Sequence, residues 1–334
     1  MKPDLYICHT PYQVLVECCR AFDAPCPPEL VLSAALPGAG ALAGRLADCG
    51  LFGDVRLFDE DACGNALQRG FWRTLLFQRL AGRRNVEKYH GFSLDPARYR
   101  AVYIHNDWSV LGRYLQDKGI PYILCEDTFA STCAAGGHQL IARQRALPHF
   151  ALRRALGYGY LYWGDWKKVS AIETEDAAKA TVPFAKERLA QRSQKAVFSR
   201  LSRAQKDLLC AVFLTAPLPE SCAGASLLLP RDFVCEGLLD EESQRRMYKA
   251  VAKKYCAGGP LFIKAHPRDA ADYKALFPDA VVLERTMPSE VLNFALPFRF
   301  ARAVTVESTV LKAFGAADEK VSLPLDEALA LAEA

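Results

Sequence analysis

The chain has 334 residues, of which 51% are apolar and 24% are charged, and its formal net charge is +4 at pH 7. This length exceeds what one hydrophobic core usually organises, so we expect two compact domains, and the apolar content excludes a disordered or fibrous protein. The 42 basic residues are nearly balanced by 38 acidic ones and form no long basic run, which argues against a nucleic-acid partner.

The twelve cysteines include no Cys-x-x-Cys pair, and most of them replace small apolar residues in predicted strands or helices. This usage favours a reduced, cytoplasmic location over a disulfide framework or a metal cluster. The chain begins directly with a strand-like run, and it has no stretch of about 18 consecutive apolar residues. We therefore expect neither a standard signal peptide nor a membrane-spanning helix.

The first third of the chain alternates short apolar runs with helix-period segments. Strands are predicted at residues 5–9, 30–33, 55–58, 101–105 and 122–125, and helices at 41–48, 65–80 and 110–118. Thr10 is suited to cap a helix that begins at Pro11. This alternation is typical of a parallel sheet covered on both faces, in an α/β fold.

From residue 142 to 203 the pattern becomes largely helical and basic, and a strand is predicted next at residues 209–215. We place the domain boundary near Gln205, between an N-terminal Rossmann-like domain (residues 1–205, with a helical extension) and a C-terminal one (residues 206–334). In the second domain we predict strands at 226–229, 261–264, 281–283 and 303–306, and helices at 241–255, 270–277 and 289–294. Doubly wound domains bind ligands at the carboxyl ends of their strands.

Two adjacent acids, Glu126 and Asp127, follow directly after the predicted strand at residues 122–125. Neighbouring side chains at a strand end cannot both face the same partner, so one acid can face the ligand while the other braces a loop or a helix start. A carboxylate at this place is suited to act as general base for a sugar hydroxyl. The alternative is that Asp127 caps a following helix and Glu126 is solvated.

The run Lys264-Ala265-His266-Pro267-Arg268 ends another predicted strand. Proline biases His266 towards an extended conformation, which presents the imidazole at the edge of the sheet. Near a phosphate the protonated imidazole is favoured, and it can donate a hydrogen bond or a proton to a departing oxygen. The flanking cations favour such an anion site over a surface histidine in a basic turn.

Two further helix starts carry polar residues. Ser308 and Thr309 follow the strand at 303–306, where hydroxyls and free backbone amides suit a phosphate or a carboxylate, although an ordinary helix cap is the simpler interpretation. Glu290, in the run Pro288-Ser289-Glu290, is placed either to bind ribose hydroxyls or as a first-turn acid favoured by the helix dipole.

The order of these motifs resembles that of the bacterial sialyltransferases, which share an acidic pair, a His-Pro motif and a Ser-Ser/Thr motif. The opening run Ile7-Cys8-His9-Thr10-Pro11-Tyr12-Gln13 is similar to the first strand and turn of glycosyltransferase family 52, the lipooligosaccharide sialyltransferases. The resemblance spans nearly the whole chain. It implies a GT-B-type fold, with an acceptor-side N-terminal domain and a C-terminal domain that binds the CMP-sugar.

The resemblance also implies the reaction, which is inverting transfer of sialic acid from CMP-sialic acid to a terminal sugar such as galactose, in an α-2,3 linkage. In that reaction Glu126 is the general base, His266 is the phosphate partner and acid, and Glu290 binds the ribose. The remaining donor-side residues are Lys264, Pro267, Ser308 and Thr309, and the acceptor-side candidates are Thr10, Gln13, Asn106, Asp107 and Asp127. Protein groups alone can stabilise the single phosphate of CMP, so we expect no metal or other cofactor.

The sequence departs from the family at Thr128, because the acidic pair is usually followed by glycine. A different loop path would weaken the assignment of Glu126, so a non-catalytic nucleotide-sugar-binding protein stays open. A hexosyltransferase of the same fold that uses a UDP-sugar is another alternative. A dinucleotide oxidoreductase is disfavoured, since no Gly-x-Gly-x-x-Gly opens the first strand-to-helix turn.

Three other features have a functional and a simpler interpretation. Residues 71–84 mix aromatic and basic side chains, which suits peripheral contact with a membrane or a core helix with a basic face. The aromatic residues of 158–166 are suited to stack on sugars, to pair with a second subunit in the homodimer that family analogy implies, or to fill a core. Asn106 and Asp107 contact the acceptor or form an Asx turn.

Overall fold

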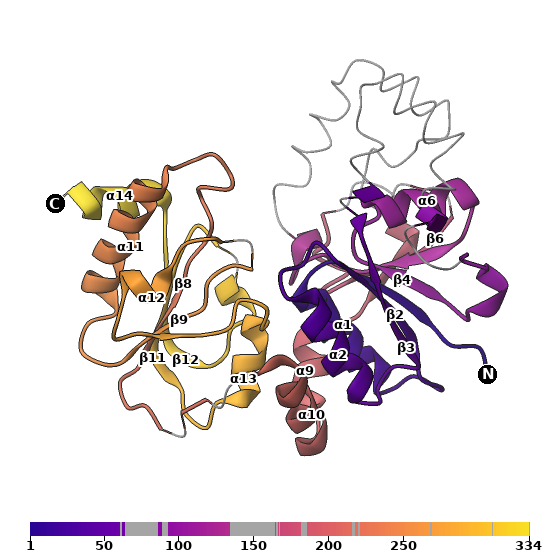
Figure 1. The fold of residues 1–334 in the computed structure, drawn as a ribbon, viewed down its shortest axis with the longest axis horizontal. Coiled ribbons are helices and arrows are strands. Elements are labelled where there is room, and N and C mark those ends of the chain that lie inside the picture. The colour runs from indigo at the N-terminus through magenta and orange to yellow at the C-terminus, as the bar shows by residue number, and fades with distance from the viewer. Residues whose placement is uncertain are drawn as a thin grey trace, which may run out of the picture. The chain divides into compact units, whose positions relative to one another are not determined.

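The computed structural model describes residues 1–60, 62–63, 86–88, 93–133, 164, 166, 168–181, 186–215, 218–219, 221–267, 269–308 and 310–333. These residues form two compact units, unit 1 (Met1–Leu201) and unit 2 (Ser202–Ala334), each built on a parallel sheet (Figure 1). The division falls a few residues before the boundary expected near Gln205. Helix α10 (Arg203–Phe213) begins there, and Ser202 caps it in a capping box with Gln205.

Unit 1 contains a seven-stranded parallel sheet in the order β3-β2-β1-β4-β5-β6-β7. Its strands are β1 (Leu5–Cys8), β2 (Glu29–Ser33), β3 (Asp54–Phe58), β4 (Val102–Ile104), β5 (Tyr122–Leu124), β6 (Val169–Thr174) and β7 (Leu189–Gln191). The described helices are α1 (Pro11–Ala21), α2 (Ala39–Asp48), α6 (Val110–Lys118) and α9 (Gln194–Arg200), with 3-10 turns at Pro96–Arg98, Ser131–Cys133 and Lys186–Arg188. The strand order reverses between β1 and β4, the switch point at which open α/β sheets bind ligands.

The central strands of unit 1 are buried on both faces because their residues are apolar in continuous runs. All four residues of β1 are buried, as are all five of β2. This pattern is typical of parallel strands that are covered by helices on each side. The predicted start of α1 is confirmed, because the Thr10 side chain accepts a hydrogen bond from the Gln13 backbone and Pro11 occupies the first turn.

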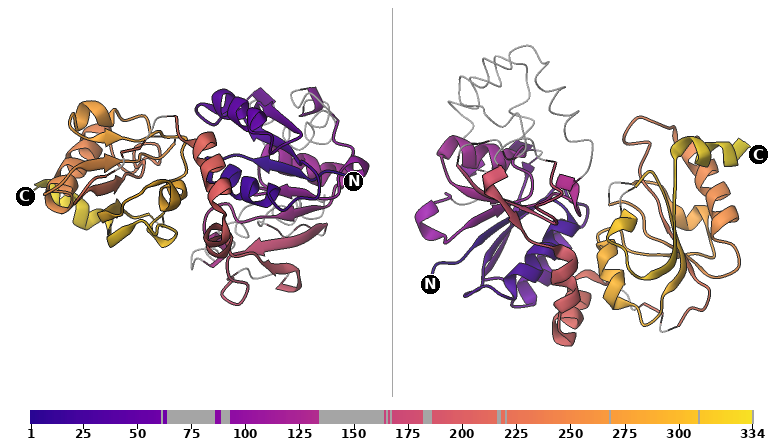
Figure 2. Two further views of the ribbon diagram at one scale, coloured as in Figure 1. Left: turned by 90° about the horizontal axis from the view of Figure 1, so that it is seen from below. Right: turned by 180° about the vertical axis from the view of Figure 1, so that it is seen from behind.

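Unit 2 contains a five-stranded parallel sheet in the order β10-β9-β8-β11-β12. Its strands are β8 (Ser226–Leu229), β9 (Leu261–Ile263), β10 (Val281–Val282), β11 (Phe300–Val306) and β12 (Ala317–Leu323). Its described helices are α11 (Glu241–Tyr255), α12 (Tyr273–Leu276), α13 (Leu292–Ala295) and α14 (Leu325–Glu333), with 3-10 turns at Ser289–Val291 and Val310–Lys312. Helices α11 and α14 lie together on one face of this sheet, and α13 lies on the other (Figures 1 and 2). The predicted α/β fold with two Rossmann-like halves is confirmed.

Two predictions of secondary structure were wrong. Residues 209–215, predicted as a strand, lie mostly in α10, because Leu209, Val212 and Phe213 are buried at the i, i+3, i+4 spacing of a helix. The largely helical interpretation of residues 142–203 misses β6 and β7, although α9 is helical as expected. The predicted helix at 65–80 and the aromatic stretches at 71–84 and 158–163 lie outside the described residues. None of the described helices is long and apolar enough to cross a bilayer.

Candidate functional site

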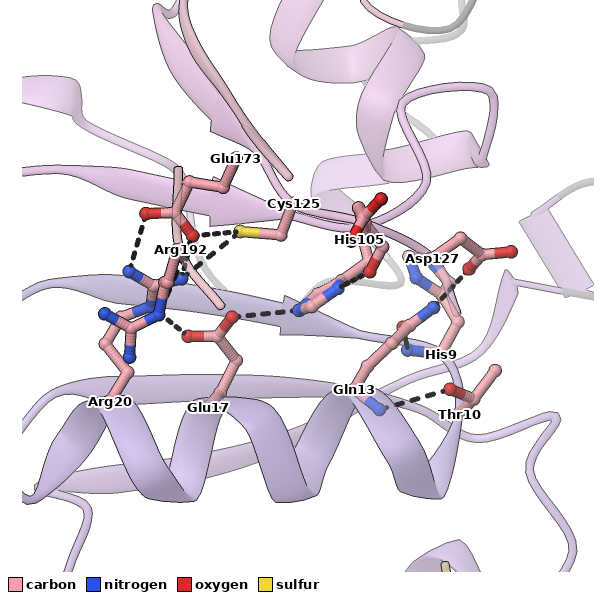
Figure 3. Close-up of polar contacts among 11 residues, drawn as sticks. His9, Thr10, Gln13, Glu17, Arg20, His105, Cys125, Asp127, Glu173 and Arg192 are labelled. Atoms are coloured by element: carbon pink, nitrogen blue, oxygen red, sulfur yellow. Dashed lines mark hydrogen bonds and ion pairs between the residues drawn. The ribbon is translucent and has the colours of Figure 1, made fainter. Parts of the chain in front are cut away.

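In unit 1, the turn between β1 and α1 is tied to the loop after β5 through Gln13, which is fully buried (Figure 3). The Gln13 side chain accepts a hydrogen bond from the His9 backbone N at 2.6 Å, and its Nε2 donates to Asp127. The structure therefore brings together the predicted candidates Thr10, Gln13 and Asp127. Among the described residues no other group donates to Asp127, so its Oδ2 is available to a ligand.

Glu126 is 7% exposed, and both of its carboxylate oxygens accept hydrogen bonds. Oε1 accepts from the backbone N of Thr132 at 2.9 Å and from the Thr132 hydroxyl, while Oε2 accepts from the backbone N of Glu175 at 2.8 Å. Burial raises the pKa of Glu126, although the bonds from Thr132 and Glu175 oppose that rise. Glu126 is thus buried rather than solvated, and it braces the loops that follow β5 and β6.

Thr128, which departs from the family pattern, has no backbone conformation that requires glycine. The left-handed residue of this loop is Ala130, with φ of 51°, and Thr128 is not in that region. The loop closes through the backbone N of Ser131, which donates to the Thr128 carbonyl at 3.1 Å. The loop thus forms without a glycine at position 128, so its backbone gives no reason to reject Glu126 as a candidate general base.

Beside these residues lies an ion-pair network centred on Arg20 (Figure 3). Arg20 Nε donates to Glu17 at 2.7 Å, and its terminal nitrogens donate to Glu173 on β6. His105 joins the network through its Nε2, 2.9 Å from Glu17, and its Nδ1 lies 2.7 Å from the Glu126 carbonyl. Although burial opposes it, the Arg20 charge and the His105 contact lower the pKa of Glu17 to about 2.

Glu17, His105 and Cys125 have ligand atoms within 4.8 Å of one another, which is close enough to hold a metal ion. Their present partners point to another role, since Glu17 is bonded to both Arg20 and His105. Burial raises the pKa of the Cys125 thiol well above its ordinary value, so the thiolate that a metal prefers is disfavoured. We interpret the group as a buried ion-pair network that fixes α1 against the ends of the central strands.

The structure gives Asn106 and Asp107 structural roles. Asn106 Oδ1 accepts from the Trp108 backbone N at 3.0 Å, which is the Asx turn considered above. Asp107 is fully buried, and its Oδ2 accepts from the Tyr122 hydroxyl at 2.9 Å and from the Gly164 backbone N at 3.0 Å. Its contact with the acceptor stays a prediction, and in this structure the side chain is instead buried against Tyr122 and Gly164.

In unit 2, Lys264 and His266 follow β9 and differ in burial. His266 is exposed at the carboxyl edge of the sheet, as the His-Pro pair predicts, whereas Lys264 is buried. Lys264 Nζ donates to the carbonyls of Ala265 at 2.7 Å and Arg285 at 3.1 Å. Burial lowers the pKa of Lys264 to about 8, while the nearby charge of Glu290 opposes that fall. Pro267, which follows His266, is half-buried.

Glu290 is buried in the 3-10 turn Ser289–Val291, and its side chain accepts a hydrogen bond from the Ser289 hydroxyl at 3.1 Å. Burial raises the pKa of Glu290, and the Lys264 charge lowers it. The structure therefore brings Lys264 and Glu290 into one interacting pair. This pairing was not apparent from the sequence, in which the two residues belong to separate motifs.

Ser308 follows β11 in a turn that is strained at Glu307, where φ is 44°. The Ser308 hydroxyl accepts from the Val310 backbone N at 3.3 Å, as the helix-cap interpretation expects, and it is partly exposed. Thr309 and Arg268 lie outside the described residues. Because β9, β8 and β11 are parallel neighbours, His266 and Ser308 follow strands that end at the same edge of the sheet and lie two strand spacings, or about 10 Å, apart.

Sequence reasoning missed Arg231, which follows β8 between these two positions. Its Nη1 donates to the Glu307 carbonyl at 2.7 Å, and Nε and Nη2 form a bidentate pair with Glu236 at 3.0 and 2.6 Å. Arg231 thus holds the strained turn that carries Ser308. A signal was present in the sequence, since Arg231 is a cation two residues past the strand predicted at 226–229.

Comparison with known proteins identifies a glycosyltransferase family 52 domain over residues 197–321. An uncharacterised protein of Haemophilus influenzae is 42% identical over 84 residues, which is 25% of this chain and only 26% of that relative's length. The crystal structure of an α/β-galactoside α-2,3-sialyltransferase from the marine bacterium Photobacterium phosphoreum is similar with a TM-score of 0.53 and 11% identity, over 96% of this chain and 89% of that one. At this identity the likeness shows a shared GT-B-like fold alone.

Proposed function

We propose that this chain is an inverting, metal-independent glycosyltransferase that transfers sialic acid from CMP-sialic acid to a sugar hydroxyl of a surface glycan. The observation that carries the proposal is the family 52 domain, because residues 197–321 contain Lys264, His266, Glu290 and Ser308. These residues follow or flank the carboxyl ends of a parallel sheet, where such sheets bind nucleotides. We also propose that the protein is cytoplasmic, contacts a membrane peripherally and forms a homodimer.

On the donor side, His266 and Ser308 serve as ligands of the CMP phosphate, together with Thr309. The exposed imidazole of His266 donates to the departing phosphate oxygen and so stabilises the charge that develops there. Glu290 binds the ribose, and the Lys264 charge opposes the rise in the pKa of Glu290 that burial causes. Pro267 ends the strand so that His266 stays at the edge.

On the acceptor side, Glu126 serves as the general base. Burial raises its pKa, which moves a carboxylate towards the range in which it accepts a proton near neutral pH. Oε2 accepts only one hydrogen bond among the described residues, so a lone pair remains for the sugar hydroxyl. Asp127, held by Gln13, lies beside it and contacts the acceptor.

The experiment is to incubate the protein with CMP-sialic acid and lactose and to measure CMP release and sialyllactose. We expect Glu126→Gln to reduce the rate about 10²- to 10⁴-fold, as for loss of a general base, and Asp127→Asn to reduce it much less. CMP binding and the unfolding temperature of each variant serve as controls. If only Asp127→Asn abolishes activity, Asp127 and not Glu126 is the general base. If only UDP-sugars serve as donors, the protein is a hexosyltransferase.

A further inference from the structure

A small cavity lies in unit 1 beside Glu126, at the carboxyl ends of β5, β6 and β7. Its volume is about 10 Å³, which is the smallest that holds one water molecule. Its lining residues include Glu126, Thr174, Arg192 and Gln194. Neither Arg192 nor Gln194 has a role in the proposed transfer reaction.

Several buried polar atoms of this lining have no hydrogen-bond partner among the described residues, although Arg192 Nε lies 3.9 Å from a Glu173 carboxylate oxygen. Nε and Nη2 of Arg192 and Oε1 of Gln194 form no hydrogen bond within the described part of the chain. Gln194 is only 6% exposed, so bulk water does not satisfy its carbonyl oxygen. Buried polar groups in native proteins are almost always paired, and an unpaired group indicates a bound water, ion or ligand.

The backbone holds both residues firmly in place. The backbone N of Arg192 donates to the Thr174 carbonyl at 2.8 Å, and that of Gln194 donates to Glu175 Oε2 at 2.6 Å. Glu175 also accepts from the Ser193 hydroxyl at 2.6 Å, while its own backbone N donates to Glu126. The backbone of Arg192 and Gln194 is therefore fixed relative to the proposed base.

The chemistry of these atoms selects the occupant. Arg192 offers donors and Gln194 offers an acceptor, so the occupant must both accept and donate hydrogen bonds. An anion leaves the Gln194 oxygen unpaired, and a cation is repelled by Arg192. Glu173 lies 3.9 Å from Arg192 and already carries a negative charge beside the cavity, which further disfavours an anion. A hydroxyl oxygen meets every requirement.

We propose that Arg192 and Gln194 form a subsite for one hydroxyl oxygen, which is a water molecule in the free protein and a hydroxyl of the acceptor sugar in the complex. The binding of an acceptor hydroxyl at this subsite rests on the proposed function. The subsite would select acceptors that carry a hydroxyl beside the one that Glu126 deprotonates. Arg192 and Gln194 are then specificity-determining residues, and neither belongs to the motifs identified in the sequence.

The first test is a high-resolution crystal structure of the protein without sugar. We expect one ordered oxygen within hydrogen-bond distance of Arg192 and Gln194, and its loss in Gln194→Leu, which keeps the backbone bond to Glu175. An empty cavity, or a chloride identified by anomalous scattering, overturns the proposal. This test requires no catalytic activity, so it is independent of the proposed function.

The second test measures transfer from CMP-sialic acid to lactose, with Gln191→Leu as the matched control because Gln191 is exposed in the same segment. We expect Gln194→Leu to raise the KM for lactose about tenfold and to leave the KM for CMP-sialic acid unchanged, whereas Gln191→Leu changes neither. An ordered oxygen together with an unchanged lactose KM would mean that the oxygen is a structural water only, which contradicts the acceptor part. Absence of any transfer, with the oxygen present, would contradict the proposed function and leave the hydroxyl site standing.

Discussion

Asp107 is a buried acid whose pKa is shifted far enough to make the stability of the fold depend on pH. It is fully buried after β4, and burial raises its pKa from 3.8 to about 6, although the bonds from Gly164 and Tyr122 oppose that rise. Its Oδ1 has no hydrogen-bond partner among the described residues. The folded state therefore binds this proton more tightly than the unfolded state does, because protonation removes the cost of a buried charge.

The predicted consequence is a stabilisation of the fold in mild acid. Because the folded pKa is the higher one, this contribution is fully present below pH 3.8, the unfolded value, and is lost as the pH rises through about 6. The full difference is about 3 kcal/mol, from roughly two pKa units. Urea unfolding of the protein and of Asp107→Asn between pH 4 and 7 would reveal it as a pH-dependent difference in stability. A difference between the two proteins that stays constant over this range would contradict the assignment.

At the residue scale, the sequence predicted positions that have a local signal. Thr10 lies where a helix begins, and His266 lies where proline ends a strand, so both could be placed from their neighbours. The network of Arg20 with Glu17 and Glu173 could not, because Glu17 and Arg20 are three residues apart and look like an ordinary pair on a helix surface. Only the sheet order, which brings β6 near α1, shows that the pair is buried.

At the element scale, the segments predicted best are those with a strong period and clear end signals. Helices α6 and α11 have the predicted bounds, and α6 ends at Gly119, whose φ of 69° favours glycine. Strand β12 was not predicted because it lies at an edge of its sheet and most of its residues are exposed and polar. Strand β7 is also an edge strand and has three residues, too few for a period to appear.

Two helix glycines make a matched pair that tests the packing of these elements. A Cβ at Gly112 in α6 would lie 2.5 Å from the backbone of Asp107, whereas a Cβ at Gly44 in α2 would meet nothing within 4 Å. We expect Gly112→Ala to destabilise the protein by about 1–3 kcal/mol or more through overpacking. Gly44→Ala should stabilise it by about 0.5–1 kcal/mol, because alanine loses less entropy in a helix.

The free energies of unfolding of both variants, measured in urea, provide the check. The opposite signs are the informative result, since helix propensity alone predicts stabilisation at both positions. If Gly112→Ala were as stable as Gly44→Ala, the close approach of α6 to Asp107 would be wrong.

At the scale of the whole molecule, the alternation of strands and helices was enough to predict two Rossmann-like halves. The strand orders follow the same plan, with a reversal beside β1 in unit 1 and beside β8 in unit 2. The boundary predicted near Gln205 falls inside the first turn of α10, because the buried residues of 209–215 resemble a strand that opens a new domain. The identity of the donor does not follow from the fold, since one fold serves many donors and acceptors.

The central claim is that unit 2 binds CMP through the edge that carries His266 and Ser308. Calorimetric titration of the whole protein with CMP and with UDP, repeated with His266→Ala and Ser308→Ala, tests it most directly. We predict that CMP binds more tightly than UDP and that each substitution weakens CMP binding by about 1–3 kcal/mol, as for loss of a hydrogen bond to a charged group. Tighter binding of UDP, or CMP binding that neither substitution changes, would contradict the claim.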